Sequence, residues 1–512
     1  MEARQQDMKV AVIDVGYNSL KMVKYRTEPD GSVRAFGQLG VMAKLGEGLD
    51  RTGYLEKASI SRTMRALKLC QESAAFDSIK HVLLIGTSPI RETINREAFL
   101  QQVRDETGLE MKVLTGNEEA LYGLLGATRS VGAPTALFFD LGGGSLELVY
   151  MENFRVKRIL SLPLGALKLT SQHAGKDGAF SRRARARMRK RISQILPSKR
   201  ELEIDEDAAL VGTGGTVRAM ARFEQDETRY ALNKVHNYSL AYDSVQNITR
   251  EFLRLRCDEL AKVEAIGEDR ARTVAAGAVV VQLLMKKFEF KRLVVSTHGL
   301  RDGILADFLG RGLGRPGAVI QTEEVEGQIP GHSNLGHSGS NSELLECLLR
   351  NGVFDNRQEK LLVVALGKSL TPECSEADPN ALFGILMSED LPMSHEDQLL
   401  MTLSLVRARR PRTSNWLASR YGLLLSQDDL KSVRRMGACL KLMEILERSS
   451  ARCRVTCSRG IRINILDAEG TFPMELAEMA AEGFSLSIRK PVIIVQRPKA
   501  REHQVTQMKA SS

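Results

Sequence analysis

The chain of 512 residues is long enough for roughly three or four domains. Hydrophobic residues make up 43% and charged residues 27%, and no run of about 18 apolar residues occurs, which argues against a membrane span. The formal net charge of +10 favours an anionic partner or substrate. The first ten residues lack the apolar core of a secretory signal, so we expect a cytoplasmic protein.

The cysteines and the basic residues each have a simple first interpretation. Seven cysteines are scattered along the chain without a paired framework, so we expect reduced thiols, with Cys453 and Cys457 structural. The positive charge is concentrated in SRRARARMRKR (181–191) and VRARRPR (406–412). Each run is either a solvated helix face or part of a track for a polyanion, and the sequence leaves both interpretations open.

Residues 1–125 predict a first α/β domain. The stretches KVAVIDVG and LKMVKYRTEPDGSVRAFG read as strands, and a PDG turn interrupts the second. A helix with an apolar stripe around Met64, the strand HVLLIGT and a helix around Phe99 follow. Hairpin strands mixed with crossover helices indicate a layered α/β fold.

Residues 126–310 repeat this order and predict a second α/β domain. The stretch ALFFDLGGGSLELVYMENFRVKRILSLPLGA again gives strand, Asp-x-Gly turn, strand, turn and strand. Two helices, the strand AALVGTGGT, the helix TVAAGAVVVQLLMKKF and the stretch RLVVSTHGLRDGIL complete the unit. Two related domains that face one another predict a ligand site in the cleft between them.

The remainder of the chain has a different character. Residues 311–342 are rich in Gly, Ser and Pro and predict a linker. Residues 343–512 are mainly helical and end in a small α/β segment. In that segment IRINIL and FSLSI alternate as strands around the helix PMELAEMAAEGF.

Three glycine-centred turns follow predicted buried strands: DVGYNS (14–19), DLGGGS (140–145) and GTGGT (212–216). Backbone N–H groups in such turns form concave sites for anions, and glycine lets phosphate oxygens approach closely. Asp14 and Asp140 open two of the turns, and we expect them to face one another across the cleft and bind Mg²⁺, which prefers oxygen ligands. Their alternative role is to cap the turns.

Two further motifs supply a carboxylate and a guanidinium group. LTGNEEALYG begins a helix, and a glutamate there either accepts a proton from an attacking water or only complements the helix dipole. GTSPIRE ends a strand with Arg91, whose guanidinium suits bidentate phosphate binding.

The motifs IDVGYNS, GTSPIRE, GNEEA, FDLGGGSLELV, GTGGT and STHGLRDGIL occur in this order over residues 8–308. The set resembles the exopolyphosphatase and guanosine pentaphosphate phosphohydrolase (Ppx/GppA) family, within the actin/Hsp70-like ATPase superfamily. The resemblance implies two ribonuclease-H-like (actin-like) α/β domains that face a cleft. It also implies hydrolysis, by water and with Mg²⁺ or another divalent cation, of the terminal phosphoanhydride bond of polyphosphate or pppGpp.

The resemblance further implies roles for individual residues. It places the catalytic base at Glu119 and the metal-binding carboxylates at Asp14, Asp140 and Glu147. It places phosphate-binding groups at Asn18, Ser19, Arg91, Gly143, Gly144, Ser145, Gly214, Gly215, Thr216 and Arg270. The family usually has serine at the position of Tyr17, whose phenol either lines the cleft or turns into the domain.

The helical part, residues 343–512, is similar to the HD-type region of the long bacterial form of this family. Its stretch VVALGKSL has neither the histidine nor the aspartate of an HD pair, so we expect no second metal site. A degenerate HD-like module of this kind is expected to act in recognising substrate length, in forming a homodimer, or in both.

The resemblance leaves several functions open. Exopolyphosphatase is the first interpretation, because the basic runs suit a long polyanion, and pppGpp phosphohydrolase uses the same groups. Two further functions are a non-catalytic polyphosphate-binding regulator and an Hsp70-like or sugar-kinase-like ATPase. The retained Glu119 and Arg91 argue against the regulator, and the GNEEA and GLRDG motifs argue against the ATPase. The basic runs lack an aromatic platform, which argues against nucleic acid as a partner.

Overall fold

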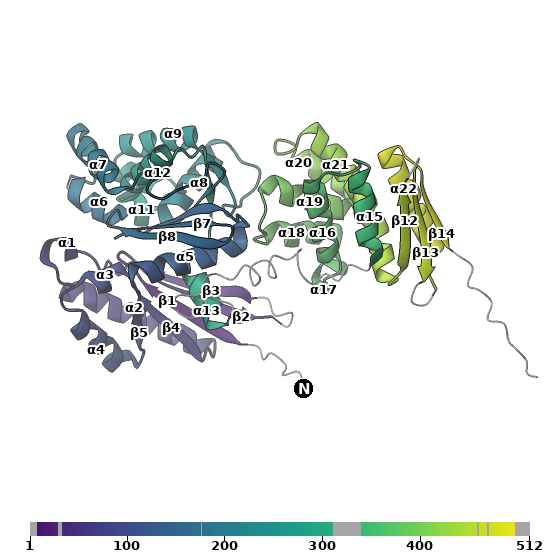
Figure 1. Cartoon of the computed structure of the whole chain (residues 1–512). Helices are drawn as coiled ribbons and strands as arrows, with labels where there is room; N and C mark the ends of the chain where they lie inside the picture. The colour runs from purple at the N-terminus through teal and green to yellow at the C-terminus, as the bar shows by residue number, and fades with distance from the viewer. Residues whose placement is uncertain are drawn as a thin grey trace, which may run out of the picture. The chain divides into compact units, whose positions relative to one another are not determined.

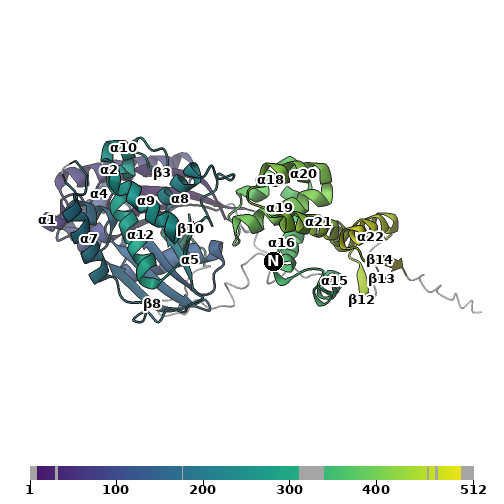
Figure 2. The same ribbon diagram turned by 90° about the horizontal axis from the view of Figure 1, so that it is seen from above.

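A computed structural model describes residues 8–28, 33–175, 177–310, 339–457, 460–467 and 471–496. These residues form two compact units (Figures 1 and 2). The first contains the described residues up to 310 together with 390–394, and the second contains the rest. The predicted PDG turn and most of the predicted linker lie outside the described residues, although 339–342 already belongs to a helix. No helix in the described ranges is long and apolar enough to cross a membrane.

The first lobe of the first unit is built on a five-stranded sheet of order β3-β2-β1-β4-β5. Its strands are β1 (Lys9–Val15), β2 (Leu20–Thr27), β3 (Val33–Val41), β4 (His81–Gly86) and β5 (Met111–Val113). Its helices are α1 (Leu49–Thr52), α2 (Lys57–Phe76), α3 (Ser88–Glu92) and α4 (Arg96–Thr107). Strand β1 is buried on both faces over Val10 to Ile13, as a central strand with a continuous apolar run should be.

The second lobe is built on a six-stranded sheet of order β10-β11-β9-β6-β7-β8. Its strands are β6 (Ala136–Leu141), β7 (Leu146–Glu152), β8 (Arg155–Leu162), β9 (Ala209–Thr213), β10 (Ser239–Ala241) and β11 (Arg292–Val295). Its helices are α6 (Ala166–His173), α7 (Arg182–Ile195), α8 (Gly215–Glu227), α9 (Tyr242–Arg254), α10 (Cys257–Ala261), α11 (Glu268–Ala271) and α12 (Val274–Phe288). The order β8-β7-β6-β9-β11 repeats β3-β2-β1-β4-β5, so the mixed α/β fold with a repeated sheet, predicted from the two Asp-x-Gly hairpins, is confirmed.

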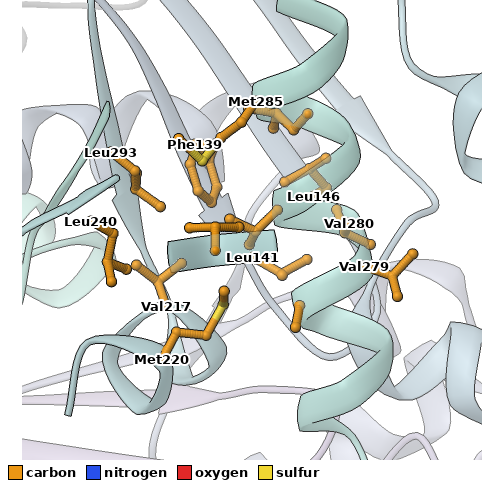
Figure 3. Close-up of a cluster of buried hydrophobic side chains, with 14 of the residues drawn as sticks. Phe139, Leu141, Leu146, Val217, Met220, Leu240, Val279, Val280, Met285 and Leu293 are labelled. Atoms are coloured by element: carbon orange, nitrogen blue, oxygen red, sulfur yellow. The ribbon is translucent and has the colours of Figure 1, made fainter. Parts of the chain in front are cut away.

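The core of the second lobe lies between its sheet and α12 (Figure 3). Helix α12 is apolar nearly all round, and Val279, Val280 and Met285 are completely buried. They pack in one cluster with Phe139 and other side chains of the sheet and of α8. This packing fixes the strand β6, which ends in the second glycine loop.

Helices α5 (Gly116–Val131) and α13 (Leu300–Phe308) join the two lobes. Leu124 of α5 belongs to a core cluster with β6 and β7, whereas Ile304 of α13 belongs to a cluster with β1 of the first lobe. The two helices touch at glycines. A Cβ atom at Gly303 would lie 1.9 Å from the carbonyl oxygen of Tyr122, so only glycine fits there. The predicted domain boundary at residue 125 falls inside α5.

The second unit is a set of helices followed by a small α/β segment. The helices are α15 (Gly339–Arg350), α16 (Asn356–Ser369), α17 (Pro372–Ser375), α18 (Pro379–Ser388), α19 (His395–Arg409), α20 (Pro411–Arg420), α21 (Gln427–Arg448) and α22 (Met474–Ile488). The strands β12 (Arg452–Cys457), β13 (Ile461–Asp467) and β14 (Val492–Gln496) form one sheet.

One predicted strand of this segment is wrong. The stretch FSLSI (484–488) forms the last turns of α22, and the third strand is β14. Five residues that alternate apolar and polar fit either structure, but Ala477, Ala480 and Phe484 form a buried stripe at helical spacing. The helix ends only at Arg489, which adopts the left-handed conformation with φ 55°.

The cysteines also differ from the prediction in one pair. Cys347 on α15 and Cys457 on β12 form a disulfide, with their Cα atoms 6.2 Å apart. The expectation of reduced thiols is therefore wrong for these two residues, while the other five cysteines are free. The partners are 110 positions apart in the sequence, so local spacing gave no indication of the pairing.

Candidate active site

Two matching turns lie at the ends of the central strands of the two lobes. Residues 16–19 join β1 to β2, and the N–H of Gly16 donates to the carbonyl oxygen of Ser19 at 3.1 Å. Residues 142–145 join β6 to β7, and the N–H of Gly142 donates to the carbonyl oxygen of Ser145, also at 3.1 Å. The two loops therefore share one internal geometry, which the repeated Asp-x-Gly pattern predicted.

Two aspartates occupy equivalent positions just before these turns. Asp14 pairs across the hairpin with Lys21, and Asp140 pairs with Glu147. Burial raises the pKa of Asp140 to about 6, with Arg218 opposing the shift and the charge of Asp14 adding to it. Burial also raises the pKa of Asp14. The structure thus brings both aspartates into one electrostatic environment.

Glu147 adds a third buried carboxylate to this environment. It is 1% exposed, and the Ser161 hydroxyl donates to its Oε1 at 3.0 Å. Burial raises its pKa well above the ordinary range, and the charges of Glu119 and Asp140 raise it further. Such a group is charged only if a cation or donors balance it.

Helix α5 begins beside these carboxylates, and its two glutamates have different roles. Thr115 caps the helix by accepting from the N–H of Glu118 at 3.2 Å, and Glu118 accepts from the N–H of Thr115 at 2.8 Å. Glu118 is therefore the capping-box partner of Thr115. Glu119 points to the interior, where Nη1 of Arg91 donates to its Oε2 at 3.0 Å.

Burial and the ion pair with Arg91 shift the pKa of Glu119 in opposite directions. Burial raises it to about 7, Arg91 lowers it, and the charges of Asp14 and Asp140 raise it again. Nη1 of Arg91 also donates to the carbonyl oxygen of Leu114 at 2.8 Å, so this nitrogen is already engaged. A phosphate would meet the remaining N–H groups of the guanidinium.

Tyr17 turns into the protein instead of lining the cleft as an exposed ring. It is 5% exposed, and its hydroxyl donates to Oδ2 of Asp50 at 3.0 Å. Its ring packs against the second glycine loop, since a Cβ atom at Gly144 would lie 2.7 Å from the ring. Lys168 of the second lobe forms ion pairs with Asp50 at 3.5 Å and with Glu92 at 3.1 Å. The Tyr17 hydroxyl is therefore already engaged, and the other polar groups of the first loop are those of Asn18, Ser19 and the backbone.

The third glycine loop lies next to Asp140, because the register of β6 and β9 pairs Asp140 with Thr213. Gly214 has φ 111°, a conformation that L side chains rarely adopt, and α8 starts directly after it. Arg270 lies against this loop, with its Nε 3.0 Å from the place of a Cβ atom at Gly215. Thr216, in the first turn of α8, is buried.

Three cations of the site were missed by sequence reasoning. Burial lowers the pKa of Lys21 to about 8, with the charges of Arg218 and Arg301 acting in the same direction. Burial likewise lowers the pKa of Arg218 to about 10. Lys21 faces Asp14 across the hairpin, Arg218 follows GTGGT, and Arg301 lies in GLRDG, so motif position was the available signal. These cations partly balance the carboxylates.

The profile of the Ppx/GppA phosphatase family matches residues 27–311, more than half of the chain. The chain belongs to this family.

Individual relatives agree with this assignment. The exopolyphosphatase 2 of Mycobacterium tuberculosis is 27% identical over 319 residues, which cover 59% of this chain and 99% of that protein. The guanosine-5'-triphosphate,3'-diphosphate pyrophosphatase of Vibrio vulnificus is 25% identical over 58% of this chain and 59% of its own length. The crystal structure of the Aquifex aeolicus Ppx/GppA family member is 28% identical, with a TM-score of 0.50, and covers 59% of this chain and 98% of that one.

This Ppx/GppA protein also has a histidine cluster in the first unit. Within the described ranges, the only three candidate metal ligands whose ligand atoms lie within 4.8 Å of one another are His236, His298 and Asp390. The hydrogen bonds of His236 leave no free ring nitrogen. Its Nε2 contacts the carbonyl oxygen of Ser130 at 3.1 Å, and its Nδ1 accepts from the N–H of Thr297 at 3.2 Å.

His298 in the same Ppx/GppA cluster is bound as a cation between two carboxylates. Its Nε2 lies 3.0 Å from Oδ2 of Asp390, and its Nδ1 lies 3.4 Å from Oδ1 of Asp302. Burial lowers its pKa, but the hydrogen bonds and charges of the two aspartates outweigh burial and raise it to about 10. In this structure His298 and the two aspartates form an ion-pair network.

Proposed function

We propose that the protein is an exopolyphosphatase, which hydrolyses the terminal phosphoanhydride bond of inorganic polyphosphate and releases orthophosphate. The observation that carries this proposal is the Arg91–Glu119 pair beside Asp14 and Asp140, in a chain of the Ppx/GppA family. A relative named exopolyphosphatase matches over almost its whole length, which supports the same substrate.

The carboxylates fit a divalent cation, and we propose Mg²⁺. Asp14, Asp140 and Glu147 are buried carboxylates with raised pKa values, and a hard cation would remove their mutual repulsion. Mg²⁺ keeps several waters and needs only one or two carboxylates, so the two aspartates suffice as direct ligands. When bound, it would neutralise charge on the phosphate oxygens.

The glycine loops bind the terminal phosphate in this proposal. Their backbone N–H groups and small polar side chains suit non-bridging oxygens. The groups assigned to this role are Asn18, Ser19, Gly143, Gly144, Ser145, Gly214, Gly215 and Thr216, with Arg91 and Arg270 as guanidinium donors. Lys21, Arg218 and Arg301 offset the negative charge nearby. A phosphoanhydride resists attack because its oxygens repel a nucleophile, and these groups weaken that repulsion.

Glu119 acts as the general base. Water attacks the terminal phosphorus in line with the bridging oxygen, and Glu119 accepts the proton that the water loses. The bond between that phosphorus and the bridging oxygen breaks, and the shortened chain keeps the electron pair. A pKa of about 7 suits a base that works near neutral pH. Arg91 holds the carboxylate in place.

A second candidate is the pppGpp phosphohydrolase activity, which the Vibrio vulnificus relative favours. The same catalytic groups would serve both substrates.

For the second unit we propose a degenerate HD-like helical module that acts in substrate-length recognition or in dimerisation. For the whole protein we propose a cytoplasmic location.

A steady-state comparison of long-chain polyphosphate, tripolyphosphate and pppGpp tests the proposal. We expect the highest kcat/KM for long-chain polyphosphate, with orthophosphate as the released product. A preference for pppGpp by a wide margin would overturn the order of the two candidates. No phosphate release from any of the three would overturn the enzymatic function itself.

A further inference from the structure

Helix α7 carries the densest positive charge of the chain, and only part of it is used inside the protein. Arg185 donates to the carbonyl oxygens of Phe180 and Leu253, and Arg189 donates to Oε1 of Gln282. These two side chains bind α7 to the rest of the lobe. The remaining basic residues of the helix are exposed, namely Arg182, Arg183, Arg187, Lys190 and Arg191.

The exposed residues, which we call the α7 basic face, have no ion-pair partner in the part of the chain that the structure describes. Arg183, Arg187 and Arg191 follow one another at intervals of four residues, so they repel one another along one side of the helix. The first turn contains no acidic residue and two exposed arginines, which also opposes the helix dipole. A bound polyanion would offset the repulsion between the arginines, and its negative charge near the start of the helix would interact favourably with the helix dipole.

The other basic run of the sequence has fewer exposed basic residues. Arg409 donates to the carbonyl oxygens of Cys374, Ala377 and Ser369, and Arg407 donates to Oδ1 of Asn415. Two of its four arginines therefore have a structural role in the second unit, as Arg185 and Arg189 have on α7, and Arg410 and Arg412 are exposed. With five exposed basic residues on one helix, α7 is the larger positive surface of the two.

Helix α6 contacts both α7 and the second glycine loop. Helix α7 packs beside α6 at the periphery of the second lobe (Figure 1). The first turn of α6 is bonded to this loop, since the N–H groups of Leu167 and Lys168 donate to the carbonyl oxygen of Gly143. At the other end of α6, His173 has no partner for either ring nitrogen among the described residues, and burial together with Arg187 and Arg191 lowers its pKa.

We propose that the α7 basic face is a second binding site for polyphosphate, which holds part of a long chain while its terminus occupies the cleft. This inference rests on the proposed function. The helix is about 21 Å long, so it spans many phosphate units of an extended chain. The stretch 181–195 has no aromatic residue on which a base could stack, which favours a polyanion without bases over single-stranded nucleic acid.

The test compares two full-length variants with the same change in charge. The first is Arg183→Gln/Arg187→Gln/Arg191→Gln on α7. The matched control is Arg250→Gln/Arg254→Gln/Arg256→Gln in the same lobe, where each arginine has a local partner within a few residues. Thermal unfolding of both variants checks that they are folded.

We expect the α7 variant to raise KM for long-chain polyphosphate about tenfold, and to leave kcat and KM for tripolyphosphate unchanged. The dependence of log KM on log salt should become shallower by about 2, since each lost phosphate contact removes about 0.7 from the slope. The control should match the wild type. An unchanged KM for the long chain, or an equal loss with tripolyphosphate, would overturn the proposal.

A binding experiment keeps this inference separate from the proposed activity. Long-chain polyphosphate and single-stranded DNA are each titrated into the Glu119→Gln protein, with and without the α7 substitutions. Loss of polyphosphate binding on α7 substitution supports the proposal even if the wild type hydrolyses only pppGpp. If the substitutions abolish DNA binding and spare polyphosphate binding, the proposal is wrong and the surface binds nucleic acid.

Discussion

Replacing Glu119 by glutamine should abolish turnover and at the same time stabilise the protein. The substitution keeps the size of the side chain and an oxygen for the contact with Arg91, but it removes the base and a buried negative charge. Loss of a general base typically costs about 10²- to 10⁴-fold in rate. We therefore expect kcat for polyphosphate to fall by at least about a hundredfold.

The gain in stability follows from the pKa of Glu119. The unfolded chain releases this proton near the ordinary value of 4.5, whereas the folded chain releases it near 7. Folding therefore becomes less favourable as the pH rises from 4.5 to 7, and the full cost of about 3 kcal/mol is present above that range. Glutamine carries no such cost. Without divalent cations, the variant should unfold roughly 6 °C higher than the wild type at alkaline pH.

The measurement is thermal unfolding in EDTA across this pH range, combined with phosphate-release assays in Mg²⁺. Glu118→Gln is the matched control, because Glu118 lies on the same turn, in the helix cap and beside Lys112, and has no contact with Arg91. It should keep turnover and change the unfolding free energy by no more than about 1 kcal/mol. Turnover of Glu119→Gln at the wild-type rate would contradict the role of Glu119 as the base. A lower stability than the wild type at alkaline pH would contradict the cost of its buried charge.

Two further predictions concern residues outside the catalytic groups. Tyr17→Ser should lower the free energy of unfolding by about 3 kcal/mol or more, because the buried ring leaves a cavity. The KM and kcat for tripolyphosphate should stay near the wild-type values, and a large rise in KM would show that the phenol does line the cleft. His298→Asn should lose stability that is fully present below pH 6.5 and disappears as the pH rises through about 10, since the folded state raises this pKa. Urea titrations across that range measure the difference, and a difference independent of pH would contradict the ion pair with Asp302 and Asp390.

The parts of the site that the sequence could predict are those with a local origin. A buried strand followed by Asp-x-Gly determines both the turn and the position of the aspartate, so the places of Asp14 and Asp140 near the ends of β1 and β6 could be predicted directly. Glu119 needed the family resemblance, because GNEEA contains two glutamates and only the structure separates the cap from the interior residue. Lys21 was missed because strand alternation indicates the face of the sheet on which its side chain lies, but not that Asp14 is its cross-strand partner.

The parts that the sequence could not predict depend on distant contacts. The disulfide partners Cys347 and Cys457 are far apart in sequence, and neither has a local signal. The stretch FSLSI fits strand and helix equally well, and burial of Phe484 against the rest of the unit decides for helix. Helix α13 follows the second lobe in the sequence but packs on β1 of the first lobe. This placement depends on the fold of the whole unit, so no local sequence pattern predicts it.

The packing of α13 on the first lobe has a consequence for biosynthesis. Val10 and Val12 of β1 leave the ribosome before the other members of their core cluster, but Ile304 of α13, which packs with them, is made almost 300 residues later. At 5–20 residues per second, that face of the sheet waits roughly 15–60 s for its cover. The first lobe is therefore incomplete until α13 has left the exit tunnel, and until then the nascent chain presents an apolar surface to chaperones. The order in which the lobes fold is set by the last helix of the first unit, not by its first strand.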